Sequence, residues 1–230
     1  MSERLADAVG TRRRAQAVTG LRTLARAPRG PARVPAAGTP SDERPSTGEL
    51  ELCDLCGTTI PPDHRHLLHL VERRIVCTCE ACWGMRGGEG DFRPTGQRTL
   101  WLDGLDVPDD LWASFQIPIG LAFFMRSTVT ECVIAMYPSP AGATESELHF
   151  ESWNRMVALN SAVGRMEADI EGLIVNRLTD PPQYVIAPID RCYELTGTIK
   201  AHWEGISGGR GVETAVAAFF DRLRGEAVPA

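Results

Sequence analysis

The sequence lacks any long hydrophobic run. Its longest apolar stretch, Ile117–Met125, is interrupted by Pro118 and Gly120. It is far shorter than the roughly 20 apolar residues that an α-helix needs to cross a bilayer. The N-terminal residues also lack the apolar core that a secretory signal requires. We therefore expect no transmembrane segment and a cytoplasmic location.

Positive charge is scarce outside the N-terminus. Residues 1–48 carry nine arginines against four acidic residues, whereas the whole chain has a formal net charge of −6, so the remainder is acidic. Proteins that bind nucleic acids generally gather Lys and Arg to neutralise phosphates. The acidic body therefore argues against a nucleic-acid partner, including a zinc-ribbon regulator that would use the arginine-rich segment on DNA.

Composition divides the chain into three parts. Residues 1–48 are rich in Arg and Pro and predict a flexible leader, in which a short helix is compatible with the spacing of apolar residues. Residues 49–98 hold most of the cysteines and predict a small metal-binding ribbon. Residues 99–226 alternate strand-like and helix-like patterns. They predict an α+β domain whose mostly antiparallel sheet is covered by helices on one side.

Two local predictions are specific enough to test. Prolines and glycine over residues 138–145 indicate a loop. The run after Pro188 has helical spacing, and we expect Asp190 to cap the N-terminus of that helix.

Five of the seven cysteines lie close together in the ribbon, and four of them form two Cys-x-x-Cys pairs. This spacing is typical of zinc ribbons and rubredoxins, in which two tight turns each present two sulfurs to one ion. An export signal is absent, so clustered thiols favour a metal over disulfides. The predicted ligands are Cys53, Cys56, Cys79 and Cys82.

Zinc and iron share this ligand spacing. Four thiolates around zinc form a structural site, whereas four around iron form a rubredoxin-like one-electron centre. Trp83 stands where rubredoxins usually have glycine, which favours zinc and leaves iron as the alternative. Cys77 is a possible substitute ligand. A redox-active dithiol would need one pair at a helix N-terminus directly after a strand, and we expect neither pair there.

Other polar residues give weaker signals. His64 and His66 could supply an additional ligand, although a polar strand surface beside the metal is the favoured interpretation. Cys132 and Cys192 lie in apolar patterns and are expected in the core. The sequence offers no set of residues with the pattern of a nucleophile, base and orienting group. These observations favour a non-enzymatic protein.

Several stretches resemble an uncharacterised bacterial domain-of-unknown-function family, encoded beside uptake nickel–iron hydrogenases in high-GC Gram-positive bacteria. They include Cys53–Gly57, His64–Leu67, Cys77–Cys79, Leu111–Phe124, Tyr137–Ser146 and Pro188–Tyr193. The resemblance covers about residues 50–225. It establishes no reaction, but it implies an accessory role in hydrogenase assembly or maturation, in handling its metals, or in electron relay. It also implies a protein partner, either a hydrogenase subunit or a maturation factor.

Overall fold

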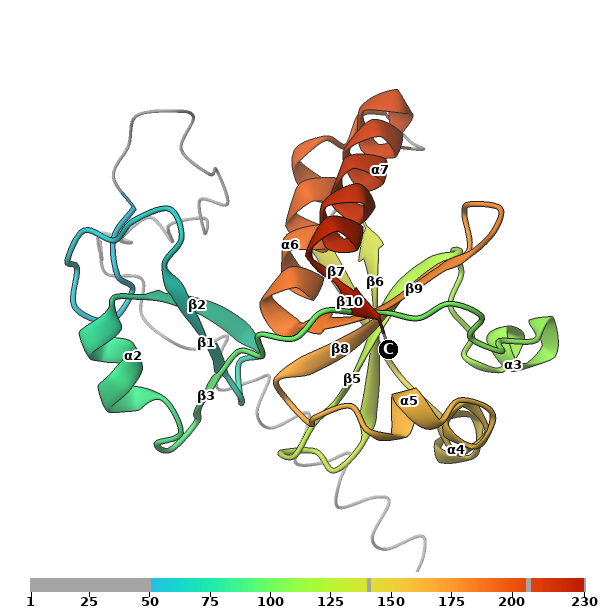
Figure 1. Cartoon of the computed structure of the whole chain (residues 1–230), viewed down its shortest axis with the longest axis horizontal. Coiled ribbons are helices and arrows are strands. Elements are labelled where there is room, and N and C mark those ends of the chain that lie inside the picture. Colours follow the sequence, from blue (N-terminus) through green and yellow to red (C-terminus); the bar gives the residue numbers. More distant parts are fainter. Residues whose placement is uncertain (1–50, 140–141, 206–207, 230) are drawn as a thin grey trace, which may run out of the picture. The chain divides into compact units, whose positions relative to one another are not determined.

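The structure is a computed structural model that describes residues 51–139, 142–205 and 208–229. The leader predicted over residues 1–48 lies outside the described residues. The described residues belong to one compact unit, which is α+β with mostly antiparallel sheets (Figure 1). Among the described residues, no helix combines the length and apolar character needed to cross a membrane.

A small sheet of order β2-β1-β3 follows the first cysteine pair. Its strands are β1 (Arg65–His69), β2 (Arg74–Thr78) and β3 (Phe92–Pro94). The hairpin expected between the two cysteine pairs is confirmed, because β1 and β2 pair antiparallel around a short turn that contains Glu72 and Arg73.

The second cysteine pair does not lie in a second tight turn. It begins helix α2 (Glu80–Arg86), with Cys79 at the N-cap. The Cys79 sulfur accepts a hydrogen bond from the backbone N–H of Cys82 at 3.4 Å, as an N-cap side chain does. The pair therefore sits at a helix N-terminus directly after β2, where we had expected neither pair.

The large sheet has seven strands in the order β10-β4-β9-β8-β5-β6-β7. All neighbours are antiparallel except β10 and β4. The strands are β4 (Leu100–Trp101), β5 (Leu121–Arg126), β6 (Val133–Ser139), β7 (Gly142–Glu147), β8 (Glu171–Asn176), β9 (Gln183–Pro188) and β10 (Val228–Pro229).

Helices cover both faces of this sheet, so the prediction of one covered side is wrong. On one face lie α6 (Ile189–Ala201) and α7 (Gly209–Glu226), and on the other α3 (Asp109–Ser114), α4 (Phe150–Leu159) and α5 (Ser161–Gly164) (Figure 1). Neighbouring side chains of β5 show why: Phe123 packs in the first cluster and Phe124 in the second, and both are fully buried. A strand buried on both faces has a continuous apolar sequence rather than an alternating one.

Two local predictions also fail. Part of the loop expected over residues 138–145 is the edge strand β7, in which Thr144 pairs with Tyr137 of β6. The polar sequence of β7 suits an edge, where one side has no neighbouring strand. Asp190 makes no cap, because the N-cap of α6 is Pro188 and no side chain bonds the first turn. Its carboxylate instead accepts a hydrogen bond from His66 of β1.

The small sheet shares its core with the large one. Leu68 of β1 and Leu70 just after it lie in the same buried cluster as Ile189 of α6 and Phe219 of α7. This packing fixes β1 beside the start of α6. It brings residues 64–69 close to residue 190, far away in the sequence.

Candidate metal centre

The first cysteine pair lies in a tight turn held by backbone hydrogen bonds. The Gly57 N–H donates to the Cys53 carbonyl at 2.8 Å, and the Cys53 N–H donates to the Thr58 carbonyl at 2.8 Å. Gly57 has φ +73°, in the left-handed region that glycine adopts without a steric penalty. The predicted tight turn is therefore present at the first pair.

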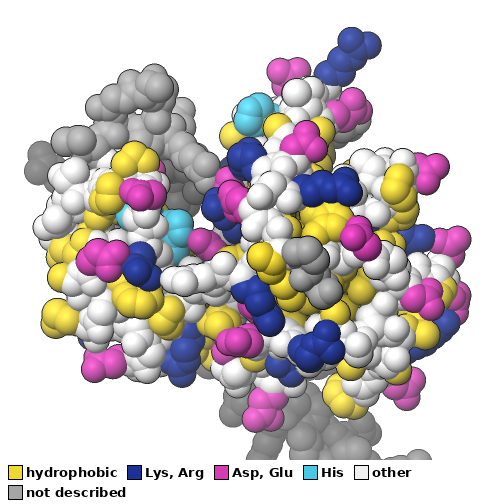
Figure 2. Space-filling view, viewed as in Figure 1, with side chains coloured by type: hydrophobic (Ala, Val, Ile, Leu, Met, Phe, Trp, Pro, Cys, Tyr) yellow, Lys and Arg dark blue, Asp and Glu magenta, His cyan; other side chains and the backbone are white. Residues whose placement is uncertain are grey.

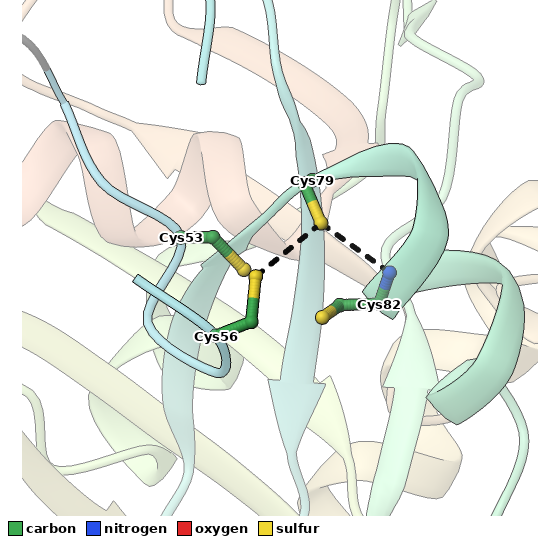
Figure 3. A group of neighbouring side chains, drawn as sticks. All are labelled: Cys53, Cys56, Cys79 and Cys82. Atoms are coloured by element: carbon green, nitrogen blue, oxygen red, sulfur yellow. Dashed lines mark hydrogen bonds between the residues drawn. The ribbon is translucent and has the colours of Figure 1, made fainter. Parts of the chain in front are cut away.

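The four sulfurs of the two pairs point toward one another (Figure 3). All lie within 4.8 Å of one another, and those of Cys56 and Cys79 are 3.7 Å apart. A tetrahedron with metal–sulfur bonds of about 2.3 Å has edges of about 3.8 Å, so this separation fits two ligands of one ion. A disulfide would need about 2.05 Å, and all seven cysteines are free thiols. The cluster is positioned to bind a metal ion.

The local electrostatics show why four thiols this close favour a cation. Burial raises the pKa of Cys53. Hydrogen bonds from backbone N–H groups, first that of Cys79, outweigh this effect and lower the pKa to about 6. Hydrogen bonds with the sulfurs of Cys56 and Cys79 raise the pKa of Cys82 to about 12. The Cys53 thiol therefore ionises readily, whereas the neighbouring Cys82 thiol resists ionising beside it. A bound cation removes this conflict, since metal ligands must be deprotonated.

Backbone hydrogen bonds join the first turn to the hairpin. The Asp54 N–H donates to the Cys77 carbonyl at 2.9 Å, and the Cys77 N–H donates to Asp54 Oδ2 at 2.8 Å. These two bonds fix the turn against the end of β2, immediately before Cys79. They explain how residues separated by more than twenty positions present sulfurs to one point.

Cys77, considered above as a substitute ligand, lies in a different group. Its sulfur gathers with ring nitrogens of His64 and His66, and these three ligand atoms all lie within 4.8 Å of one another. His66 stands directly opposite Cys77 in the β1–β2 register, which places both side chains on one face of the hairpin. The two histidines are therefore part of a cluster rather than a plain polar surface.

The charge state of His66 reflects its neighbours. Burial lowers the pKa of His66, but hydrogen bonds to Asp190 and Cys77 raise it more, to about 9. No local pattern signals the role of Asp190, because 124 positions separate it from His66 and its place before a helical run fits a cap equally well.

The two remaining cysteines lie with the core. Cys192 in α6 is fully buried, and burial raises the pKa of its thiol well above the ordinary value. Cys132 is partly buried against the same cluster, in the turn before β6. The prediction that they are core residues is confirmed for Cys192 and holds partly for Cys132.

Comparison with known proteins gives one match. The sequence model of a family described as "Family of unknown function (DUF5947)" matches residues 52–227. The match spans the cysteine module and the seven-stranded sheet except β10. No curated protein and no solved structure matches the chain.

Proposed function

The chain belongs to the family of unknown function DUF5947, and we propose that it is a non-enzymatic accessory protein built around a structural zinc ion. The ligands would be Cys53, Cys56, Cys79 and Cys82. The protein would act through contacts with a protein partner. The convergence of these four sulfurs from a turn and a helix is the observation that carries the proposal.

A structural role fits the position of the cluster. Helix α2 contains no buried residue, and the turn over residues 54–59 is exposed. Neither element is held by a substantial apolar core of its own. A metal bound by sulfurs of both would fasten them to each other and to the hairpin. Four protein ligands also fill a tetrahedral zinc ion, which is the usual arrangement in structural rather than catalytic zinc sites.

The biological setting is proposed from the resemblance described above. That resemblance implies a role in the assembly of the enzyme, in handling its metals or in its electron supply. We propose that a hydrogenase subunit or maturation factor is the partner and that they meet in the cytoplasm. On the face shown in Figure 2, acidic and basic side chains are interspersed. This supports a protein partner over a polyanion, which requires clustered basic residues.

A second candidate is a rubredoxin-like Fe(Cys)4 protein that transfers electrons to or from the hydrogenase. One property favours it: nearby backbone N–H groups, first that of Cys79, lower the pKa of the Cys53 thiol. Hydrogen bonds to ligand sulfurs are one of the factors that set the potential of iron–sulfur centres. Trp83, which directly follows the second pair where rubredoxins usually have glycine, favours zinc instead.

Metal analysis and an absorption spectrum, measured on full-length protein purified without oxygen from iron-replete cells, separate these candidates. We expect a colourless protein whose zinc content falls by one ion per chain in a Cys56→Ser/Cys79→Ser variant and is unchanged in Cys132→Ser. A red protein bleached by dithionite would establish the iron centre. Absence of any stoichiometric metal would refute both.

The partner is tested separately, by pull-down with hydrogenase subunits and maturation factors as purified candidates. Binding that is lost in the Cys56→Ser/Cys79→Ser variant would support a role for the metal-held module in recognition. No binding to any of these proteins would remove the hydrogenase part of the proposal and leave the zinc site standing.

A further inference from the structure

The group formed by His64, His66 and Cys77 has the features of a metal site in its own right. Two imidazoles and one thiol present ligand atoms within 4.8 Å of one another. None of these residues belongs to the four-cysteine group. Nitrogen and sulfur donors of this kind suit divalent transition metals of intermediate softness, zinc among them.

The hydrogen bonds of His64 prepare one ring nitrogen for a metal. Its Nδ1 atom lies 2.8 Å from the Pro61 carbonyl oxygen and 3.2 Å from Glu51 Oε2. Both atoms are acceptors, so Nδ1 carries the proton and Nε2 of the neutral ring keeps its lone pair. That tautomer is the one that can bind a cation through Nε2.

His66 is prepared in the same way by a carboxylate. Its Nδ1 donates to Asp190 Oδ2 at 2.8 Å, which leaves Nε2 as the ligand atom. Histidines that bind metals generally donate their other N–H to a carboxylate or carbonyl, which fixes the ring and increases its basicity. His64 has the carbonyl version of this arrangement and His66 has the carboxylate version.

A buried atom without a partner marks the same place. The His64 side chain is only 6% exposed, and within the described residues its Nε2 atom has no hydrogen-bond partner. A buried polar atom left unpaired costs roughly 1–3 kcal/mol. A metal ion bound by Nε2 would satisfy this atom, and a structural role for His64 on the strand surface does not explain it.

Space for a further ligand lies beside the two histidines. A cavity of about 150 Å³ is lined by His64, Arg65, His66, Trp83, Thr95, Gly96, Gln97 and Asp190. An ion held by three protein groups keeps one tetrahedral position open, as catalytic zinc sites do. Here that position would face the cavity, large enough for water or a small ligand.

We propose that His64, His66 and Cys77 bind a second divalent transition-metal ion, separate from the four-cysteine ion, with an exchangeable fourth ligand in the adjacent cavity. Asp190 is the positioning residue for His66. One thiolate leaves a divalent ion with a net positive charge, so the open position favours water, hydroxide or a small anion. The four-cysteine ion would hold the fold, and this second ion would meet a ligand from solution.

The same residues suggest one competing arrangement. Cys77, His66 and Asp190 stand in the order of a thiol nucleophile, a base and an orienting carboxylate. Two observations favour the metal: a ring nitrogen of His64 lies within 4.8 Å of the same ligand atoms, and Cys77 is not among the residues that line the cavity a substrate would occupy. A nucleophile does not need the third group, and it should be accessible from the cavity that holds its substrate.

Metal stoichiometry of the full chain, reconstituted with zinc and separately with cobalt(II), tests the proposal. We expect two ions per wild-type chain and one in His64→Ala, His66→Ala and Cys77→Ser. Circular dichroism and thermal unfolding should show that each variant remains folded. His149→Ala and Cys132→Ser are matched controls outside both groups and should keep two ions. Asp190→Asn should still bind the second ion, but about 10–100-fold more weakly.

Ligand exchange gives a second readout. Azide or cyanate added to the cobalt protein should change its absorption through the open position in the wild type and in Cys132→Ser, and not in His66→Ala. If the wild type binds a single ion that the histidine variants retain, the proposal is wrong. It is also wrong if Cys77 is alkylated rapidly in the wild type and slowly in His66→Ala with no change in metal content.

The two metal proposals fail independently. A wild-type chain with a single ion that is retained in Cys56→Ser/Cys79→Ser and lost in His66→Ala would keep the second site and refute the structural zinc. The reverse result would do the opposite.

Discussion

The cysteine module and the seven-stranded sheet are stabilised by different interactions. Both faces of the large sheet are buried beneath helices, so its strands contribute a continuous apolar core. The module has a small sheet, an exposed turn and a helix without buried residues. The stabilisation gained by burying apolar surface scales with the area removed from water. The turn and helix bury too little area to be stabilised in this way alone. The comparison indicates that the module depends on metal chemistry and the large sheet on packing.

Strand β1 belongs to both regions. On one side Leu68 packs into the core beneath α6 and α7, and on the other His66 contacts Cys77 and Asp190. The hairpin should therefore remain in place when the first turn and α2 loosen. The boundary between stabilisation by metal and stabilisation by packing should therefore lie inside the module, between the hairpin on one side and the first turn and α2 on the other.

The largest effect is expected from removing the four-cysteine site. In Cys56→Ser/Cys79→Ser, hydrogen exchange should become fast over residues 51–60 and 79–87 while the seven-stranded sheet keeps its protection. Structural zinc contributes an apparent binding free energy of about 10–16 kcal/mol in small zinc domains, which these elements cannot replace. Unchanged protection in both segments would show that the module is stable without metal.

A core truncation should act on the other region. Phe124 is fully buried, with ring centroids 5.2 Å from Phe115 and 6.0 Å from Trp153. Phe124→Ala should lower the free energy of unfolding by about 3–5 kcal/mol in urea denaturation, because it leaves a cavity between sheet and helices. Zinc content should stay the same. A parallel loss of zinc would mean that the two regions are not separable.

A buried carboxylate provides an intermediate effect. The Glu171 side chain is 3% exposed, and each of its oxygens accepts a hydrogen bond from Arg98 at 2.8 Å. Arg98→Ala should lower the free energy of unfolding by about 2 kcal/mol, because the buried carboxylate loses its charged partner and keeps only the hydrogen bond from the Glu167 N–H. The partial exposure of Arg98 keeps the cost below that of a fully buried pair. Glu171→Gln/Arg98→Ala should recover part of the loss, and full stability of Arg98→Ala alone would show that water replaces the guanidinium.

His66 should produce a pH effect in protein that carries only the four-cysteine ion. Its pKa of about 9 exceeds the ordinary value of 6.5, so the protonated ring stabilises the folded state. That contribution is fully present below pH 6.5 and is lost as pH rises through about 9. NMR of the imidazole should show the titration, and Asp190→Asn should lower its midpoint. A midpoint at the ordinary value would contradict the contacts with Asp190 and Cys77.

The smallest effect is expected at the exposed tip of the hairpin. Arg74 and Glu72 form an ion pair at 3.3 Å with both side chains more than half exposed. Arg74→Ala should change the free energy of unfolding by less than about 0.5 kcal/mol, because water and salt screen such a pair. A larger loss in thermal denaturation would point to a contribution of Arg74 beyond this pair.

The cysteine pattern predicted the metal site well because its chemistry is local. Cys53 and Cys56 belong to one turn and Cys79 and Cys82 to one helical turn, so spacing alone places each pair on one side of the chain. The helical form of the second pair could not be read from that spacing, since a tight turn and a first helical turn both bring residues three apart together. The outcome depends on the N-cap hydrogen bond of Cys79.

The second cluster was only partly visible in the sequence. Its pattern indicates His64 and His66 as candidates for an additional ligand and Cys77 as a possible substitute ligand, but it does not show that these three residues gather in one group. Asp190 was interpreted as a helix cap. Its real partner lies on a strand of a different sheet, and no local pattern encodes that contact. The continuous apolar run of β5 contained the information that both faces are buried, but it was read as one covered side.

By itself, the sequence determined the α+β class, the cysteine pairs with the hairpin between them, and the net negative charge of the chain. These properties follow from composition and from spacings of a few residues, which fix which side chains share a turn or a face. The tertiary structure alone decided that helices cover both sides of the sheet and that Cys77 faces His66 rather than the other sulfurs. It also decided that Asp190 contacts β1. Those contacts exist because Leu68 and Leu70 share a core with α6 and α7, and packing between distant segments is a property of the folded chain.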